Sequence, residues 1–387
     1  MIPYAKQNIS PEDVQAVVDV LNSDYLTQGP VIPLFEEAIK AYCGSEYAVA
    51  VNSATSALHI ACLALEVAEG DIVWTSPISF VASANCALYC NANVDFVDID
   101  PETYLLSPER LEEKLICAES LGKLPKVVIA VHLAGQSCEM EKIFNLSLRY
   151  GFKIIEDASH AIGGRYQDKP IGNCSYSDIV IFSFHPVKII TTGEGGMLTT
   201  NSSSLVKSLR SLRTHGITSL PSEMKMRELD EVWNYQQIAI GFNYRMTDIQ
   251  AALGLSQLSR LEKFVDYRNV LANRYNTLLS DLPIVKPYQS PVCFSSYHLY
   301  IIRLKLEQIN KTHKQIFTEL KELGILVNLH YIPIYRHPYY EAMGFNSGYC
   351  NEAESYFKEA ISLPIYYDLS EEQQFYISNT LHSVILN

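Results

Sequence analysis

The sequence predicts an α/β fold, in which a mainly parallel β-sheet is covered by helices on both faces. Short apolar runs alternate with helical patterns through the first 200 residues, and these runs are almost continuously apolar. Strands buried on both faces have this composition because neither side of the sheet meets water. The pattern then changes, and a smaller α+β unit is expected toward the C-terminus.

The elements of the larger unit follow in order. Ser10, with a proline and two acidic residues after it, is a typical N-cap and predicts a first helix over 10–23. A second helix over 34–44 ends at Gly44. The expected strands lie at 47–52, 71–76, 94–100, 126–135, 152–159, 178–186 and 195–201, with helices between them at 55–65, 81–89, 108–119 and 140–150.

The C-terminal part has a different pattern. Segment 219–235 is polar and irregular and is expected to be a loop. A helical pattern over 247–282 has a break signal only at Gly254. Beyond it we expect strands at 298–304 and 325–331, a helix at 314–323 and a closing helix. We therefore expect a large domain over 1–250 and a small domain over 251–387, and residues 1–25 could pack with the small one.

Composition limits the possible partners. The formal net charge of −13 argues against binding to nucleic acid or to an anionic membrane, since both require a basic face. The nine cysteines are scattered, without a Cys-x-x-Cys pair, as expected of reduced thiols. There is no signal-peptide pattern, no apolar run long enough for a membrane span and no His-Glu-x-x-His motif. We expect a cytoplasmic protein without a metal.

Lys188 is the first candidate catalytic residue. It stands in SFHPVKIITTGEGG, between an apolar run and a turn rich in Thr and Gly. Burial lowers the pKa of a lysine, and a neutral amine can form an imine with an aldehyde such as pyridoxal phosphate. An ordinary solvated lysine is the alternative.

Asp157 ends the apolar strand of KIIEDASHA. Pyridoxal phosphate needs a carboxylate beside its ring nitrogen, because the protonated ring is the electron sink. The alternative is an aspartate that caps a helix. Glu156 is expected to point to the other side of the strand, and His160 could bind the phenolic oxygen side of the cofactor or cap the turn.

A phosphate site is expected where VNSATSALHIACLAL turns from strand to helix. The backbone N–H groups of a helix start bind phosphate, and the helix dipole favours its charge. Ala54, Thr55 and Ser56 would form this cup, and Ser183 would add a hydroxyl group. Ordinary helix capping explains any one of them equally well. Phe80 could stack on the cofactor ring, or could simply be a core residue.

Asn243 and Arg245 precede the long helical pattern in GFNYRMTDIQ. An asparagine and an arginine together can hold a phosphate or a carboxylate. A surface turn capped by Thr247 is the alternative.

These blocks resemble the DegT/StrS family of pyridoxal-phosphate-dependent nucleotide-sugar aminotransferases over nearly the whole chain. The resemblance rests on YLTQGPVIPLFEEAIKAYCG, VNSATSALHIA, EDASHAIGG, FSFHPVKIITTGEGGML and GFNYRMTDIQAALGLSQL. It implies the aspartate aminotransferase-like type I fold, with a seven-stranded sheet, and a homodimer with shared active sites. It also implies that the cofactor alternates between pyridoxal and pyridoxamine phosphate.

The resemblance also implies roles for individual residues. Lys188 would bind the cofactor covalently and shuttle protons, and Asp157 would contact the pyridine nitrogen. Phe80 would lie on the ring and Asn243 would reach in from the partner subunit. Thr55 and Ser183 would contact the phosphate.

Within the family, the sequence is most similar to the branch that moves an amino group from L-glutamate to C4 of a UDP-linked 4-keto-6-deoxy-N-acetylhexosamine, in pseudaminic acid biosynthesis. Many members have glutamine where this chain has His160, which favours that branch. Substrate-side residues would be Thr27, Gln28, Arg245, His330 and Tyr331.

Other functions remain as alternatives. One is another UDP- or dTDP-sugar 3- or 4-aminotransferase of surface polysaccharide synthesis. Related sugar dehydratases usually have a histidine in place of Lys188, and a ligand-sensing regulator would usually carry a basic DNA-binding segment. A dinucleotide-binding dehydrogenase would need a Gly-x-Gly-x-x-Gly motif after the first strand.

Overall fold

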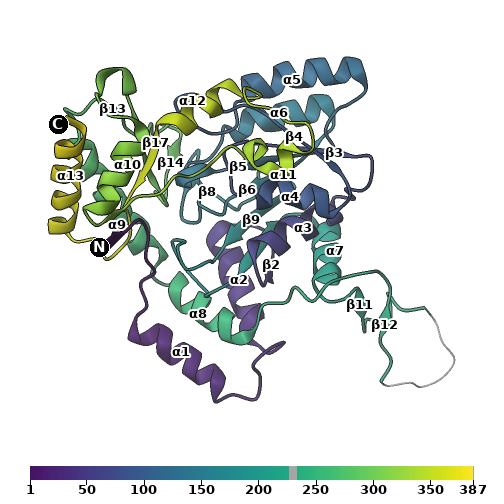
Figure 1. Cartoon of the computed structure of the whole chain (residues 1–387). Helices are drawn as coiled ribbons and strands as arrows, with labels where there is room; N and C mark the ends of the chain where they lie inside the picture. The colour runs from purple at the N-terminus through teal and green to yellow at the C-terminus, as the bar shows by residue number, and fades with distance from the viewer. Residues whose placement is uncertain (226–232, 387) are drawn as a thin grey trace.

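The computed structural model describes residues 1–225 and 233–386, and it confirms the predicted α/β fold with a seven-stranded sheet (Figure 1). The strand order is β2-β10-β9-β6-β5-β3-β4. Neighbouring strands are parallel except where β10 pairs with β2 and β9. The strands are β2 (Tyr47–Val51), β3 (Ile72–Thr75), β4 (Asn93–Phe96), β5 (Val127–Val131), β6 (Lys153–Asp157), β9 (Ile179–Ser183) and β10 (Gly196–Thr200).

The sheet is deeply buried. All residues of β5, β9 and β10 are buried, which explains why β5 and the first four residues of β9 are apolar without alternation. The parallel strands share one carboxyl edge, and β10 runs in the opposite direction and begins there. The loops that carry most of the expected site residues leave the sheet at this edge, as is usual in open α/β folds.

The helices around the sheet begin and end close to where the sequence predicts. Ser10 caps the first helix in a capping box with Asp13, and Gly44 ends the second in a left-handed conformation with φ 74°. The helices are α1 (Pro11–Leu21), α2 (Val31–Cys43), α3 (Ala54–Ala64), α4 (Ala82–Tyr89), α5 (Pro108–Leu121), α6 (Met140–Tyr150) and α7 (Ser203–Arg213).

The long helical pattern over 247–282 forms two helices, α8 (Asp248–Leu258) and α9 (Leu261–Leu278). The break expected at Gly254 is therefore wrong, because the chain turns at Ser259 and Arg260. Gly254 lies inside α8, where a Cβ would come within 2.6 Å of the Phe35 ring on α2. This glycine allows two helices to pack closely and does not end either of them.

The C-terminal unit contains a three-stranded sheet of β13 (Ile284–Val285), β15 (Tyr300–Leu304) and β17 (Ala360–Leu363). Its own apolar cluster includes residues of α10 (His313–Glu322) and α13 (Glu371–Leu386). The strand expected over 325–331 is only β16 (Ile325–Leu326), which pairs with β1 (Ile2–Pro3). Asn328 to Tyr331 instead form the irregular segment that lies near the site.

The expected domain boundary near residue 250 stays a prediction. Ile2 packs into the apolar cluster of the C-terminal unit, so the start of the chain is attached to that unit. Helix α1 packs against α8. Tyr335 and Tyr356 pack instead against the core of the large sheet. Tyr335 lies in the short 3-10 helix η3 (Ile334–Arg336), before α11 (Pro338–Glu341), and Tyr356 lies in α12 (Asn351–Glu359).

Two smaller features complete the described fold. The strands β7 (Arg165–Tyr166), β8 (Lys169–Pro170) and β14 (Cys293–Phe294) form a small sheet. The pair β11 (Ile217–Thr218) and β12 (Gln236–Gln237) forms an arm that projects from the body (Figure 1). The loop expected over 219–235 belongs to this arm, and its residues 226–232 lie outside the described part.

Candidate active site

Asp157 and Lys188 meet at the carboxyl edge of the large sheet. Asp157 is the last residue of β6 and is buried, and Lys188 is a half-buried residue in the loop between β9 and β10. Burial lowers the pKa of Lys188 to about 8, because a desolvated ammonium is unfavourable, although the Asp157 carboxylate partly opposes this shift. The amine is therefore neutral far more often at neutral pH than a solvated lysine would be.

A buried pair of hydroxyl groups holds the Asp157 carboxylate. Ser83, in the first turn of α4, donates a hydrogen bond of 2.7 Å to Asp157 Oδ2, and Ser79 Oγ lies 2.7 Å from Ser83 Oγ. The backbone N–H of Ser159 donates to Asp157 Oδ1 at 3.2 Å. Sequence reasoning missed Ser79 and Ser83, since small residues after a strand carry no distinctive signal.

The start of α3 has the features of a phosphate cup. Ser53 is the N-cap and accepts the N–H of Ser56, whose hydroxyl donates to Asn52 at 2.7 Å. The Ser56 side chain is thus already engaged. The backbone N–H groups of Ala54 and Thr55 have no hydrogen-bond partner among the described residues, so they can bind an anion.

Gly196 and Ser183 border this cup. Gly196 begins β10 and pairs with Ser183, the buried last residue of β9. A Cβ on Gly196 would lie 2.7 Å from the Ala54 nitrogen and from the Ser53 backbone. Only a glycine lets β10 approach the helix start this closely.

Phe80 follows β3 and lies outside the core, with 59% of its surface exposed. The core alternative for this phenylalanine is therefore wrong. Its ring centroid is 6.4 Å from that of Tyr331. Such an exposed aromatic side chain beside a site is available to a flat ligand.

His160 lies in the turn after β6 and is buried. Its Nδ1 accepts a 3.2 Å hydrogen bond from the backbone N–H of Ala134, and its Nε2 lies 3.1 Å from Tyr331 Oη. Burial is the main reason that the pKa of His160 is well below its ordinary value, and the nearby Lys188 lowers it further. His160 is therefore a neutral imidazole in this site.

Two further histidines surround His160. The His298 ring centroid is 4.3 Å from that of His160, and sequence reasoning missed this residue. His330 Nδ1 lies 2.8 Å from Ser362 Oγ, and its Nε2 lies 3.3 Å from Asn328 Nδ2. Both ring nitrogens of His330 thus have partners within the chain, and burial lowers its pKa to about 3.

Asn243 and Arg245 adjoin the phosphate cup through the backbone. The N–H of Asn52 donates to Tyr244 O at 2.9 Å, and Arg245 pairs with Val51 as an isolated bridge. The Asn243 side chain is exposed. Within the described residues Arg245 forms no ion pair, and its buried Nε lacks a hydrogen-bond partner.

Thr27 and Gln28 lie in an exposed loop beside the start of α8. Thr27 bridges to Thr247, and the Asp248 carboxylate accepts the N–H of Gly29 at 2.7 Å. This loop is thereby attached to the segment that carries Asn243 and Arg245. No hydrogen bond joins Thr27 or Gln28 to Lys188 or Asp157 in the described part of the chain.

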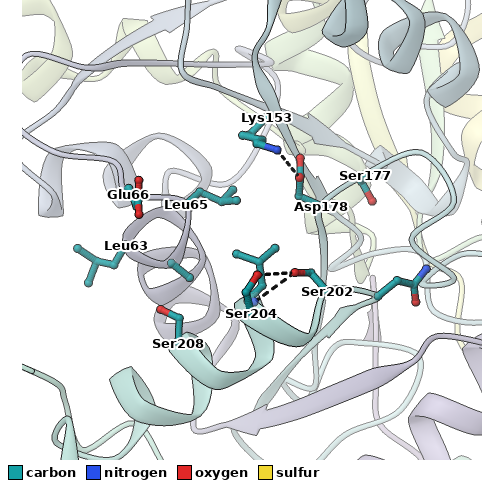
Figure 2. A pocket seen from close by; sticks show the side chains of 12 residues that line it. Leu63, Leu65, Glu66, Lys153, Ser177, Asp178, Ser202, Ser204 and Ser208 are labelled. Carbon is teal, nitrogen blue, oxygen red and sulfur yellow. Dashed lines mark hydrogen bonds and ion pairs between the residues drawn. The ribbon is translucent and has the colours of Figure 1, made fainter. Parts of the chain in front are cut away.

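A separate hollow of about 560 Å³ lies at the opposite edge of the sheet (Figure 2). Lys153, the first residue of β6, forms an ion pair of 3.1 Å with Asp178 there. Ser202 and Ser204 at the start of α7 also line it. This hollow faces the amino ends of β6 and β9. It is therefore distant from Asp157 and Lys188, which lie at the carboxyl ends of these strands.

The part of the chain that the structure describes has no group of three or more His, Cys, Asp or Glu residues arranged to hold a metal ion. Of its helices, none combines the length and the apolar character that crossing a bilayer requires.

Comparison with known proteins identifies relatives of the whole chain. The UDP-4-amino-4,6-dideoxy-N-acetyl-beta-L-altrosamine transaminase of Campylobacter jejuni is 34% identical over 391 residues, covering 100% of this chain and 98% of that protein. The structure of Helicobacter pylori PseC, described as an aminotransferase involved in the biosynthesis of pseudoaminic acid, matches with a TM-score of 0.89 at 32% identity, covering 100% and 99% of the two chains.

Spr1654 from Streptococcus pneumoniae in its PLP form matches with a TM-score of 0.87 at 29% identity, covering 99% and 98% of the two chains, and a PMP form is also known. The model of the DegT/DnrJ/EryC1/StrS aminotransferase family matches residues 7–382. The chain therefore belongs to this family of pyridoxal-phosphate-dependent sugar aminotransferases.

Proposed function

We propose that this protein transfers the amino group of L-glutamate to C4 of a UDP-linked 4-keto-6-deoxy-N-acetylhexosamine, in pseudaminic acid biosynthesis. The observation that carries the proposal is the half-buried Lys188, whose pKa is lowered to about 8, beside the buried Asp157 carboxylate. The descriptions of the Campylobacter and Helicobacter relatives support this choice of sugar.

The residues present fit pyridoxal phosphate. The free N–H groups of Ala54 and Thr55, with the Ser183 hydroxyl, suit a phosphate, and the exposed Phe80 suits a ring face. Ser56 would act through its backbone, since its hydroxyl bonds to Asn52. When bound, the cofactor's protonated ring takes up the electron pair released as the substrate's C–H bond breaks.

Two side chains would carry the proton chemistry. Asp157 would keep the pyridine nitrogen of a bound cofactor protonated, and its two oxygens are already oriented by Ser83 and Ser159. The neutral Lys188 Nζ would take the α proton of glutamate as a general base and, once protonated, would hold it beside the cofactor site as a general acid. The same amine would move a proton in the opposite direction when the keto sugar is aminated.

The substrate side would use residues around this centre. Arg245 has no ion pair in the described part of the chain, so its guanidinium can hold a carboxylate or phosphate group. We propose Thr27, Gln28 and Tyr331 as further contacts to the sugar nucleotide. We propose that His330 supports Tyr331, since both of its own ring nitrogens are engaged.

We propose that two copies of the chain share their active sites. Asn243 is exposed beside the phosphate cup, as expected of a residue that reaches into the site of a second copy. Apolar side chains on and beside the projecting arm are also exposed, and a second copy would cover them. They are Leu220, Trp233, Tyr235, Ile238 and Ile240.

A panel of UDP- and dTDP-linked 3-keto and 4-keto sugars, each supplied with L-glutamate, tests the proposal. We expect amination at C4 of the UDP-linked 4-keto-6-deoxy-N-acetyl sugar, identified by NMR of the product. Preference for another sugar would instead identify another nucleotide-sugar aminotransferase, since a relative of 34% identity does not define the acceptor. Cofactor binding without transfer to any sugar would favour the ligand-sensing regulator.

A further inference from the structure

We infer that Cys90 and Cys62 form a peroxide-sensitive thiol pair, in which peroxide oxidises Cys90 and Cys62 then closes a disulfide between α4 and α3. Both cysteines are reduced in the structure. The proposed aminotransferase chemistry uses neither of them. The pair is therefore a modification site that is separate from the proposed function.

Two neighbouring helices bring three thiols together. Cys62 lies on α3, whereas Cys86 lies on α4 and Cys90 is its C-cap. Cys86 and Cys90 are four residues apart and so share one face of their helix. Both helices are rich in alanine and pack against each other. The Cys62 thiol consequently forms side-chain hydrogen bonds with both Cys86 and Cys90.

Cys90 is the most reactive of the three thiols. Cys62 and Cys86 are fully buried, whereas Cys90 keeps 6% of its surface exposed at the end of α4. His59, three residues before Cys62, forms a hydrogen bond with Cys90, and its Nδ1 lies 3.1 Å from Tyr244 Oη. The hydrogen bond from Cys62 is the main reason that the pKa of Cys90 is lowered, and His59 adds to it although burial opposes both. Cys90 is therefore a thiolate more often than an ordinary cysteine, and the thiolate is the nucleophile.

Other buried cysteines lack this activation. Cys43 interacts electrostatically with Cys174, but burial raises the pKa of both thiols, so they stay protonated. Burial likewise raises the pKa of Cys293 and Cys350. Peroxide should therefore react with Cys90 before it reacts with these four thiols.

The oxidation has two steps. The Cys90 sulfur attacks one peroxide oxygen and breaks the O–O bond, which gives a sulfenic acid and a hydroxide that takes the proton lost by Cys90. The Cys62 sulfur then attacks the Cys90 sulfur and displaces its hydroxyl group, which leaves as water with the Cys62 proton. Two thiols are thus oxidised to one disulfide, and one hydrogen peroxide is reduced to two molecules of water.

The disulfide would join the two helices that carry the proposed cofactor site. Helix α3 begins at the phosphate cup, and the first turn of α4 carries Ser83, which holds Asp157. Cys86 Sγ also donates to Ser83 O at 3.4 Å. Disulfide sulfurs lie only about 2 Å apart, so the helices must shift when the bond forms. We expect oxidised protein to bind pyridoxal phosphate about tenfold more weakly, the effect of losing one hydrogen bond to a charged group. This consequence rests on the cofactor position proposed above.

The experiment treats the holoenzyme with hydrogen peroxide and maps its peptides by mass spectrometry without reduction. We expect a cross-linked peptide pair that joins Cys62 to Cys90 with the loss of two hydrogen atoms, and that disappears after treatment with dithiothreitol.

Three variants test the assignment. Cys90→Ser and Cys62→Ala should each abolish the cross-link. In Cys62→Ala the oxidised Cys90 keeps its sulfenic acid, which dimedone should label. Cys117→Ser is the matched control, because Cys117 is exposed on α5, and this variant should form the full amount of cross-link. Circular dichroism checks that each variant is folded.

Reduced Cys62 and Cys90 in the peroxide-treated wild type would overturn the inference, and this measurement depends on no variant. A link between Cys62 and Cys86, or oxidation of Cys43 and Cys174 instead, would also overturn it. Fluorescence titration of cofactor-free protein compares the affinity of the oxidised and reduced forms, and equal affinities would refute the effect on the cofactor site. Neither measurement uses a sugar, so failure of the wild type to aminate any nucleotide sugar would refute the proposed function alone.

Discussion

Ser83 and Asp157 are joined by a buried hydrogen bond of 2.7 Å between the serine hydroxyl and Asp157 Oδ2. A carboxylate can only accept a hydrogen bond, so the Ser83 hydroxyl donates its proton to Asp157. The Ser79 hydroxyl must therefore be the donor in its 2.7 Å hydrogen bond to Ser83. This chain runs from the loop after β3 to the end of β6. It fixes the direction in which the proposed ring-nitrogen partner faces.

We expect Asp157→Asn to fold almost normally and to lose turnover by orders of magnitude. An amide has nearly the same shape but cannot keep the pyridine nitrogen protonated. Steady-state rates with L-glutamate and the keto sugar measure the loss. Ser83→Ala keeps the carboxylate and should lose far less. Wild-type turnover in Asp157→Asn would contradict the role of this residue.

Lys188→Ala should prevent covalent attachment of the cofactor. Borohydride reduction of the holoenzyme followed by peptide mass mapping should place the label on Lys188 in the wild type and on no residue in the variant. Lys123→Ala is the matched control, because that lysine is exposed and precedes the amino end of β5, on the side of the sheet away from Asp157 and Lys188. A label on another lysine in the wild type would mean that the site is misplaced.

The rate at which cofactor-free enzyme captures pyridoxal phosphate should rise with pH, be half-maximal near pH 8 and level off at higher pH. Below this pKa the Lys188 amine is an ammonium and cannot attack the aldehyde, whereas above it the amine is neutral. The rate is followed by the absorbance of the bound cofactor after mixing. A half-maximal rate near pH 10, as for a solvated lysine, would show that burial does not tune this amine.

Mixed dimers test the proposed sharing of active sites. Lys188→Ala and Asn243→Ala should each be nearly inactive when expressed alone. Coexpressed chains form some dimers in which one site has an intact Lys188 from one copy and Asn243 from the other, so part of the activity should return. Coexpression that restores nothing, with mixed dimers confirmed by affinity tags, would place both residues in the site of one copy.

Gly196→Ala should weaken cofactor binding, since the new Cβ would come within 2.7 Å of the Ala54 nitrogen and displace the phosphate cup. Fluorescence titration of cofactor-free enzyme measures the affinity. Gly254→Ala is the control, because the new Cβ on α8 would meet the Phe35 ring on α2 and would disturb the packing of these two helices. That variant should lower the melting temperature with little change in affinity. Equal loss of affinity in both would point to a general loss of folding.

Much of the fold could be predicted because its signals are local. Short, largely apolar runs that alternate with helical patterns predicted all seven strands of the sheet, and Ser10 and Gly44 marked helix ends. The ordered motifs identified the family and hence the cofactor. The strand ends also placed Asp157 and Lys188 at one edge, since parallel strands share a carboxyl side.

The remaining features depend on contacts between segments that are distant in the sequence. Ser83 lies 74 positions from Asp157, and Tyr331 lies 171 positions from His160. Gly254 looked like a break but serves close helix packing. The sequence alone therefore determined the sheet, the family and the edge of the sheet at which Asp157 and Lys188 lie. Tertiary structure decided which proton each side chain offers, because that depends on the partners that packing brings within hydrogen-bond distance.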